Sequence, residues 1–273
     1  MKNDYQEATL VSVVMASFNE PSNIIGEAID SILAQTYGNF ELLIIDDSTN
    51  EETIHKLNSY NDPRIRLVRQ GHHAYLPEKL NVGLKMARGK YIARMDADDI
   101  ALKERFEKQV DFLEKHSNIY VIGGQVNLMD ESGYVFSEKK YPLKGLKLYM
   151  HSTYKSPFNH PSTMFRKELI DSGFLYNESL TKTSEDIDLW LRIIHEGYGI
   201  ANLPIKVTNY RVREKMAQWR SSKKEIEYMA YVRKKTFSIK CPIHSLLSFV
   251  AGRVFLLIPQ KAVTKMYIQM YKK

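Results

Sequence analysis

The chain contains very little cysteine: Cys241 is the only one in 273 residues. A single thiol excludes a disulfide within the chain and is consistent with a reducing compartment. Residues 1–7 contain no apolar segment of the kind that directs secretion, so we expect a cytoplasmic protein. With 44% hydrophobic residues, the chain has enough apolar side chains to bury a large core.

A glycine-rich phosphate loop is also missing. The first predicted strand, residues 10–15, is followed by Ser17-Phe18-Asn19-Glu20 and not by a run of glycines. Neither G-x-G-x-x-G nor a P-loop therefore follows it, which disfavours a dinucleotide site or a P-loop nucleotide site. A phosphorylated ligand in this chain would have to be held through a metal ion instead.

Long hydrophobic runs are absent. Residues 243–258 form an apolar stretch that Arg253 interrupts, and sixteen residues are fewer than the roughly twenty that span a bilayer. An amphipathic helix lying on a membrane surface fits this stretch better. The alternative is a helix that packs on the rest of the chain or on a second copy in a homodimer.

Acidic residues are scarce in one part of the chain only. Residues 205–273 hold 16 Lys or Arg against 3 Asp or Glu, whereas residues 1–204 hold 23 against 29. The basic residues are therefore remote from the acidic motifs described below, which argues against a nucleic-acid-binding protein. The basic C-terminal region predicts contact with an anionic surface, most simply the inner face of the cell membrane.

The first half of the chain alternates strand and helix signals with short connections. Strands are predicted at 10–15, 40–45, 64–68 and 91–93, and helices at 22–35, 51–60 and 76–88. Gly89 is suited to end the last of these helices in a left-handed conformation. This alternation predicts an α/β fold with a Rossmann-like, mainly parallel sheet that carries helices on both faces.

Acidic side chains follow two of the predicted strands. Asp46-Asp47 ends the second strand, and Asp96, Asp98 and Asp99 follow the fourth. Because parallel strands bind ligands beyond their carboxyl ends, these acids should converge on one crevice. Asp96 and Asp98 could chelate a hard divalent cation through oxygen. The alternative is a solvated acidic turn.

The pattern changes after residue 120. Residues 120–136 predict an antiparallel hairpin with a turn at Gly133, and residues 160–166 a further strand. A helix begins after Ser184, its predicted N-cap, and the side chains of Ile187, Leu191 and Ile194 should face the sheet. We expect a catalytic domain over residues 1–210 and a basic, amphipathic helical extension over residues 211–273.

Four motifs in this order resemble those of the family 2 glycosyltransferases, which are inverting, nucleotide-sugar-dependent enzymes with a GT-A fold. They are residues 13–20 (VVMASFNE), 44–49 (IIDDST), 95–99 (MDADD) and 184–190 (SEDIDLW). The resemblance covers residues 10–210. It is nearest to bacterial members that build capsule, exopolysaccharide or lipo-oligosaccharide chains, and it implies a small antiparallel element on the acceptor side.

The resemblance implies a donor site for a UDP-linked sugar. Phe18 would lie against the nucleobase, and Asp47 would accept the uracil imide N–H. Asp98, with Asp96, would bind Mn²⁺ or Mg²⁺ at the diphosphate. The implied nucleotide-sugar-binding residues are Ala16, Phe18, Glu20, Asp47 and Asp96.

The resemblance also implies a base and an acceptor. Asp186 would deprotonate the hydroxyl of a saccharide or lipid-linked glycan, although its position at a helix N-terminus favours the ionised carboxylate. The alternative for Glu185 and Asp186 is a helix-capping acid cluster. Residues expected near the acceptor or the phosphates are His160, Arg166, Glu185 and Arg192, and internal salt bridges are the alternative for the two arginines.

Two other classes of protein share part of this pattern. A sugar-nucleotide pyrophosphorylase also combines an α/β fold with acids and a metal, but a glycine-rich segment should follow its first strand. A non-catalytic, metal-dependent carbohydrate-binding protein would need the metal site but no base. Hydrolysis of a nucleotide sugar would argue against this second alternative.

Overall fold

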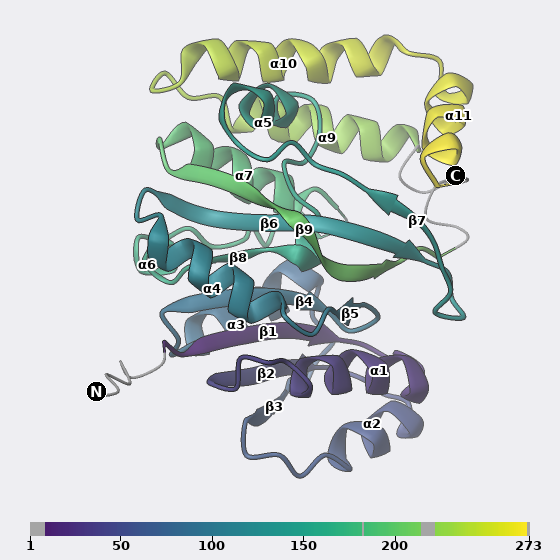
Figure 1. Ribbon diagram of the computed structural model, residues 1–273. Coiled ribbons are helices and arrows are strands. Elements are labelled where there is room, and N and C mark those ends of the chain that lie inside the picture. The colour runs from purple at the N-terminus through teal and green to yellow at the C-terminus, as the bar shows by residue number, and fades with distance from the viewer. Residues whose placement is uncertain (1–8, 182, 214–221, 272–273) are drawn as a thin grey trace, which may run out of the picture.

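The computed structural model describes residues 9–181, 183–213 and 222–271 (Figure 1). Its strands form one nine-stranded sheet in the order β3-β2-β1-β4-β8-β6-β9-β5, with β7 paired to β6. The strands are β1 (Val11–Ser17), β2 (Phe40–Asp46), β3 (Ile65–Arg69), β4 (Tyr91–Asp96), β5 (Ile100–Ala101), β6 (Ile119–Met129), β7 (Val135–Lys139), β8 (Met164–Arg166) and β9 (Gly199–Arg211). The helices are α1 (Ser22–Leu33), α2 (Glu51–Asn58), α3 (Leu76–Met86), α4 (Arg105–Lys115), α5 (Gly145–Ser152), η1 (His160–Ser162), α6 (Glu168–Asp171), α7 (Glu185–His195), α9 (Lys223–Lys235), α10 (Pro242–Leu257) and α11 (Gln260–Tyr271).

The first four strands are parallel, as predicted. Strand β1 lies between β2 and β4, with Ala16 beside both Ile45 and Asp96. Because the three strands run in the same direction, their carboxyl ends meet at one edge of the sheet. This register brings the acids after β2 and β4 together at that edge.

Helices cover both faces of the sheet, which confirms the predicted fold class. On one face, α1 and α4 bury Ile25, Ile29 and Phe106 against the strands. On the other, α3 and α7 bury Leu80 and Trp190 in a second apolar cluster. The alternate side chains of β1 divide between the two clusters, which is the period-two pattern of a strand buried on both sides.

The second half of the sheet is mixed. Strands β6 and β7 form the predicted antiparallel hairpin, and Gly133 in its turn has φ of 88°. The strand expected at 160–166 is shorter, because residues 160–162 form the 3₁₀ turn η1 before β8 begins. Strand β9, parallel to β6, was not predicted, and Pro204 and Lys206 interrupt its apolar pattern.

The expected role of Gly89 is wrong. Helix α3 ends at Met86, and Ala87 after it is extended, with φ of −64° and ψ of 130°. Gly89 is needed because the backbone of β1 passes close by. A β-carbon at Gly89 would lie 2.6 Å from the carbonyl oxygen of Leu10 and 2.6 Å from the amide nitrogen of Ser12.

Helix α7 has two apolar faces, which corrects the expectation of one. Trp190 and Ile193 pack against the sheet. Ile187 and Leu191, expected on the sheet, pack instead against Val232 of α9. Ser184 lies at the N-cap as predicted, but its backbone is left-handed (φ 64°) and its side chain makes no capping hydrogen bond.

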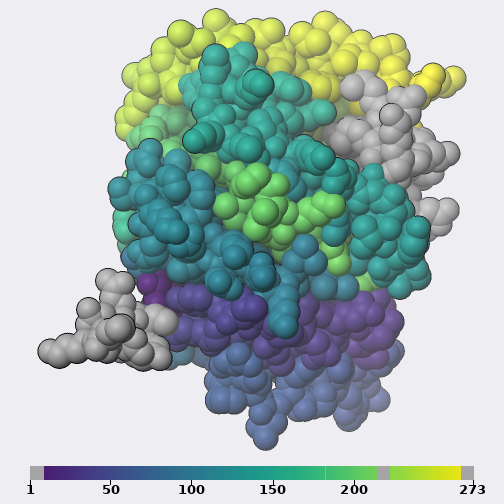
Figure 2. All heavy atoms as spheres, in the orientation of Figure 1, coloured from purple at the N-terminus to yellow at the C-terminus, as the bar shows by residue number. Residues whose placement is uncertain are grey.

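The C-terminal helices lie together at one end of the molecule, where Figure 2 shows them as the yellow-green surface. Helix α9 packs on α7, and α10 packs on α9 and α5. Buried polar contacts join α10 to the rest of the chain: His244 lies 2.9 Å from His195 and 2.8 Å from the hydroxyl of Ser152. No helix in the described part of the chain is long and apolar enough to cross a membrane.

Candidate active site

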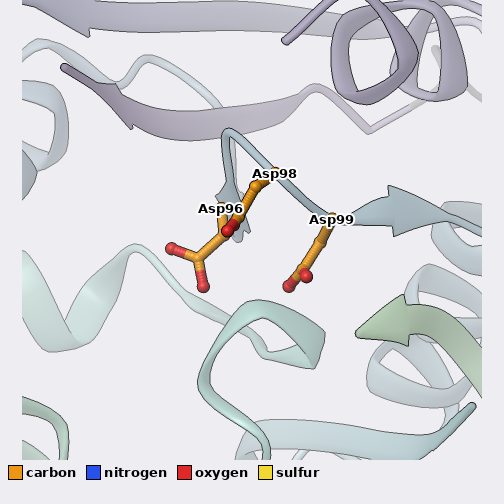
Figure 3. Close-up of side chains that lie close together, drawn as sticks. All are labelled: Asp96, Asp98 and Asp99. Atoms are coloured by element: carbon orange, nitrogen blue, oxygen red, sulfur yellow. The ribbon is translucent and has the colours of Figure 1, made fainter. Parts of the chain in front are cut away.

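The acid cluster lies where β4 ends and the chain turns toward β5 (Figure 3). Asp96, Asp98 and Asp99 each place one carboxylate oxygen within 4.8 Å of the others. Asp96 pairs with Arg94 at 2.5 Å, and Asp98 pairs with Arg213 at 2.8 Å. The sequence predicts all three acids at this edge of the sheet but assigns only Asp96 and Asp98 to a metal ion.

Asp99 is buried, and β5 begins at the next residue. Its Oδ1 accepts a hydrogen bond from the backbone N–H of Arg211 at 2.7 Å. Its Oδ2 is buried and has no hydrogen-bond partner among the described residues. A buried carboxylate oxygen without a donor is an unsatisfied acceptor that a cation could satisfy.

Negative charge is crowded in this cluster. Burial and the neighbouring charges of Asp96 and Glu20 together raise the pKa of Asp98 to about 6, although Arg213 opposes the rise. Three hard oxygen donors in such a position suit Mg²⁺ or Mn²⁺, whose charge would relieve the repulsion. The residues present therefore fit a divalent metal ion.

A second polar group lies at the end of β2 around Asp47. Its two carboxylate oxygens accept hydrogen bonds from Lys79 Nζ at 2.5 Å and from the backbone N–H of Ala74 at 2.7 Å, and His73 lies 2.9 Å away. Burial opposes ionisation, but these donors outweigh it and hold the pKa of Asp47 below its usual value. Asp47 is therefore a fixed anion at the sheet edge.

Phe18 lies beside this anion. Its ring is half exposed, 4.5 Å from the ring of His73, and Lys79 Nζ lies 5.4 Å from its centre. Sequence reasoning missed both Lys79 and His73. The signal for Lys79 was a lysine on the apolar, sheet-facing side of α3, where it is only 4% exposed. A lysine is rarely buried without an acidic partner.

The loop after β1 is fixed by Asn19, whose backbone is left-handed with φ of 52°. Its side-chain oxygen accepts hydrogen bonds from the backbone N–H groups of Thr49 at 2.8 Å and Asn50 at 3.0 Å. These bonds tie the end of β1 to the end of β2. Glu20 on the same loop pairs with Arg213 at 2.6 Å, which brings it next to the acid cluster.

The start of α7 carries the other acids. Asp186 accepts a hydrogen bond from the hydroxyl of Ser156 at 3.3 Å. Burial, and then the charge of Asp186, raise the pKa of its neighbour Glu185 to about 8. Asp188, two residues further along the helix, forms an ion pair with Arg192 at 2.7 Å.

His160 lies against the same end of α7. Its Nδ1 is 3.8 Å from Glu185, and its Nε2 is 2.7 Å from the hydroxyl of Tyr176. Burial, and then the charge of Arg94, lower the pKa of His160 well below its usual value. The ring is therefore neutral at physiological pH and can accept or donate one proton in a hydrogen bond.

One cavity of about 360 Å³ connects these two acidic regions. Its lining includes Asp96, His160, Glu185 and Asp186. Residues that lie about 90 positions apart in the chain thus face the same space. The structure brings the predicted metal residue Asp96 and the predicted base Asp186 to one cavity.

The structure does not bring Arg166 and Arg192 to this cavity. Arg166 pairs in register with Tyr91 at the opposite end of β4, and donates to the carbonyl oxygen of Leu113 at 2.7 Å. Arg192 binds Asp188 and the carbonyl oxygen of Leu175. Both arginines satisfy internal acceptors, which corrects the expectation that they contact acceptor or phosphate.

Comparisons with known sequences agree with this arrangement. The chain matches the family described as Glycosyl transferase family 2 over residues 12–174. It is 30% identical to the amylovoran biosynthesis glycosyltransferase AmsE of Erwinia amylovora over 94% of this chain and 98% of the relative. It is 28% identical to WfaP of Escherichia coli, named as a UDP-Glc:alpha-D-GlcNAc-diphosphoundecaprenol beta-1,3-glucosyltransferase, over 74% of this chain and 77% of the relative.

Solved structures share the fold at low sequence identity. The chain is similar to Staphylococcus aureus TarS in complex with UDP-GlcNAc, with a TM-score of 0.71, 18% identity and coverage of 91% of this chain and 72% of that one. It is also similar to the mannosyltransferase PcManGT of Pyrobaculum calidifontis in complex with GDP-Man and Mn²⁺, with a TM-score of 0.65, 16% identity and coverage of 96% and 80%.

The fold and the acid-lined cavity at the strand ends are those of a GT-A glycosyltransferase. The chain belongs to glycosyltransferase family 2.

Proposed function

We propose that the chain transfers a sugar, with inversion, from a UDP-linked donor to a glycan acceptor in the synthesis of a bacterial surface polysaccharide. The observation that carries this proposal is that Asp96, a member of the acid cluster, and the acidic end of α7 line one cavity. A transferase of this kind needs both, since one side must hold the diphosphate and the other must activate the acceptor.

The uridine site is formed by Phe18 and Asp47. The ring of Phe18 offers an aromatic face to the base, and Asp47 is an anion positioned to accept an imide N–H. Ala16, at the end of β1, and Glu20, on the following loop, complete the donor side. TarS, which shares the fold, was solved with UDP-GlcNAc.

Asp98 and Asp96 would hold Mn²⁺ or Mg²⁺ beside the diphosphate, with Asp99 as a further oxygen donor. When bound, the metal neutralises the charge that develops on the leaving diphosphate. The shared fold of PcManGT, solved with Mn²⁺, is consistent with this site. The buried Arg94 forms an ion pair with Asp96, which fixes the position of this carboxylate at the donor side of the cavity.

Asp186 would act as the base. It takes the proton of the acceptor hydroxyl as that oxygen bonds to the anomeric carbon and the bond to the diphosphate breaks. Its hydrogen bond from Ser156 orients the carboxylate toward the cavity. With its raised pKa, Glu185 is mostly protonated at neutral pH, so the pair bears about one negative charge.

We also propose that the enzyme lies on the inner face of the cell membrane through α10. The polarity of this helix is opposite to that of a surface helix in water. Its polar or small residues, such as His244 and Ser248, are buried against the protein. Its outward side is an apolar stripe that includes Ile243 (74% exposed) and Leu257 (82% exposed). The other members of this stripe are Leu246, Leu247, Val250 and Val254.

The charge of the surrounding region favours a bilayer as the partner of this stripe. Residues 205–273 carry 16 Lys or Arg and only 3 Asp or Glu, which matches an anionic leaflet. A membrane location also suits a lipid-linked acceptor, and the name of the relative WfaP specifies such an acceptor for that enzyme. A homodimer that buries the stripe is the competing outcome.

A panel of nucleotide sugars tests the proposed function. We expect one UDP-sugar to bind with Mn²⁺ and to be hydrolysed slowly in the absence of acceptor. A pyrophosphorylase would instead form a nucleotide sugar from a sugar phosphate and a nucleoside triphosphate. A carbohydrate-binding protein would leave every donor intact, and either result would overturn the proposal.

A further inference from the structure

The carboxylate of Asp47 is covered by three hydrogen-bond donors. Its Oδ1 accepts from Lys79 Nζ at 2.5 Å, and its Oδ2 accepts from the backbone N–H of Ala74 at 2.7 Å. The third donor is the ring of His73, whose Nδ1 lies 2.9 Å from Oδ2. An ionised carboxylate only accepts, so this nitrogen carries the proton of the hydrogen bond. With its side chain only 1% exposed, Asp47 offers an incoming N–H group almost no free surface.

Of these three donors, only His73 can leave without a change in the fold. Lys79 is buried and also donates to the carbonyl oxygen of Ser17 at 3.0 Å. The N–H of Ala74 belongs to the main chain of a buried residue. The His73 side chain, in contrast, is 57% exposed. Rotation about its Cα–Cβ bond would remove the ring from Asp47 while the backbone stays in place.

The ring of His73 makes the two contacts that the proposed function assigns to uracil. Its centre lies 4.5 Å from that of the Phe18 ring, with an angle of 50° between the ring planes. Its Nδ1–H is bonded to Asp47, the acceptor assigned to the imide N–H of uracil. Two rings cannot share this space and this acceptor, so the imidazole and the base exclude each other.

We propose that His73 is an internal competitor of the nucleobase: its imidazole holds the base site until the uracil of the donor displaces it from Phe18 and Asp47. This inference rests on the proposed function and adds to it a residue that sets the affinity for the nucleotide. Tyr75, two residues further along, has a half-exposed ring centred 6.0 Å from that of His73. It offers the displaced imidazole an aromatic neighbour.

This competition lowers the affinity for the nucleotide without removing any contact of the bound state. If the base site is free for only part of the time, the apparent affinity falls by that fraction. Asp47 keeps three donors throughout, because the N–H of uracil replaces that of His73 and no buried acceptor is left unsatisfied. UDP is also the leaving group of the transfer, so a weaker base site would ease its release.

The variant His73→Ala tests this inference, because it opens the base site and leaves Lys79 and Ala74 on Asp47. Calorimetry on the full chain measures the affinity for UDP with saturating Mn²⁺. We expect His73→Ala to bind UDP roughly threefold more tightly than the wild type, or better, as for a site that His73 holds about two thirds of the time. Equal affinity would overturn the inference. Weaker binding by His73→Ala would also overturn it, because the ring would then support the bound base.

The matched control is His72→Ala, which removes the preceding histidine of the same loop. The His72 ring is 65% exposed and lies 2.9 Å from Glu78. We expect His72→Ala to bind UDP as the wild type does. Inorganic diphosphate with Mn²⁺, which has no base, should bind equally to the wild type and to His73→Ala. A gain of affinity in either control would overturn the inference, since the loop or its charge would then cause the effect.

Nuclear magnetic resonance observes the displacement directly. In a protein with isotopically labelled histidines, the ring signals of His73 are identified by their loss in His73→Ala. We expect these signals to shift when UDP saturates the protein with Mg²⁺, a diamagnetic ion, and to stay in place with inorganic diphosphate and Mg²⁺. His73 signals that do not change at saturation with UDP would contradict the displacement.

The two proposals fail differently. If the wild type and His73→Ala bind UDP with equal affinity, the inference about His73 is wrong and the proposed function stands. If neither protein binds UDP or any nucleotide sugar, the proposed function itself is wrong.

Discussion

Arg213 donates to Asp98 from two of its nitrogens, at 2.8 and 3.1 Å, and the same guanidinium reaches Glu20 at 2.6 Å. A side chain from beyond β9 thereby places a positive charge on the acid cluster that the fourth strand presents. Arg213 and a metal ion would compete for the same oxygen of Asp98. The guanidinium partly neutralises the negative charge that a divalent cation would neutralise.

Arg213→Ala should therefore bind free Mn²⁺ more tightly than the wild type in the absence of nucleotide. At about pH 8, where Asp98 is ionised in both proteins, we expect a gain of roughly threefold or more, since one competing charge near the site is removed. Titration of Mn²⁺ followed by electron paramagnetic resonance measures the dissociation constant. Arg192→Ala, which frees Asp188 outside the cluster, is the control. Weaker Mn²⁺ binding by Arg213→Ala would show that the arginine supports the metal site.

Asp47→Asn should weaken the binding of UDP and reduce the preference for UDP over CDP. The charged acceptor for an imide N–H is lost, and a hydrogen bond to a charged group contributes about 1.5–3 kcal/mol, or roughly tenfold or more in affinity. Calorimetry with UDP and CDP measures both effects. A thermal melt checks that the fold stays stable when Lys79 loses its charged partner. An unchanged ratio of the UDP and CDP affinities would show that Asp47 does not bind the uracil.

Asp186→Asn should lose turnover but keep the donor. Removal of a general base lowers kcat by roughly 10² or more, whereas the affinity for nucleotide sugar with Mn²⁺ should stay near that of the wild type. Asp188→Asn is the control on the same helix, since Asp188 is bound to Arg192 and does not line the cavity. If Asp186→Asn instead raises the donor dissociation constant at unchanged kcat, Asp186 is a binding residue.

Much of this site could be predicted from the sequence because its acids follow apolar strands. A short apolar run predicts a buried strand and where it ends, and parallel strands bring their carboxyl ends together. Lys79, His73 and Arg213 were missed because their roles depend on contacts between segments remote in sequence. The sequence also did not predict that the polar side of α10 is the buried one. The periodicity of a helix does not show which of its sides packs against the rest of the protein.

The buried pair His195 and His244 should make stability fall in mild acid. Burial lowers the pKa of both rings, that of His244 to about 4. The folded state therefore keeps them neutral, while the unfolded chain takes up protons below about pH 6.5, so their contribution is complete above that pH and is lost as the pH falls toward 4.

We expect His244→Gln to show a smaller fall in melting temperature between about pH 7.5 and 5 than the wild type, although its melting temperature at the higher pH will be lower. His116→Gln, an exposed histidine stacked on Phe112, should follow the wild-type curve. The difference between the two curves isolates the pair from buried acids such as Glu185, whose raised pKa acts in the opposite direction. Parallel curves for His244→Gln and the wild type would show that the His195–His244 pair does not cause the loss of stability in acid.

The apolar stripe of α10 should carry the protein to anionic membranes. Flotation with vesicles that contain phosphatidylglycerol is expected to recover the wild type, and Leu246→Gln/Val250→Gln/Leu257→Gln should stay in the soluble fraction. These side chains are exposed, so the melting temperature should change little. Leu146→Gln/Ile205→Gln, which alters exposed apolar residues that do not belong to α10, should float like the wild type.

Salt separates the two forces in this binding. Each Lys or Arg near the surface contributes about 1 kcal/mol that salt screens, whereas burial of the stripe does not depend on ionic strength. Recovery should therefore decrease with salt but not disappear. The membrane proposal is wrong if the wild type does not bind anionic vesicles at low salt. If light scattering then gives twice the monomer mass for the wild type and the monomer mass for the triple variant, the stripe is a subunit interface.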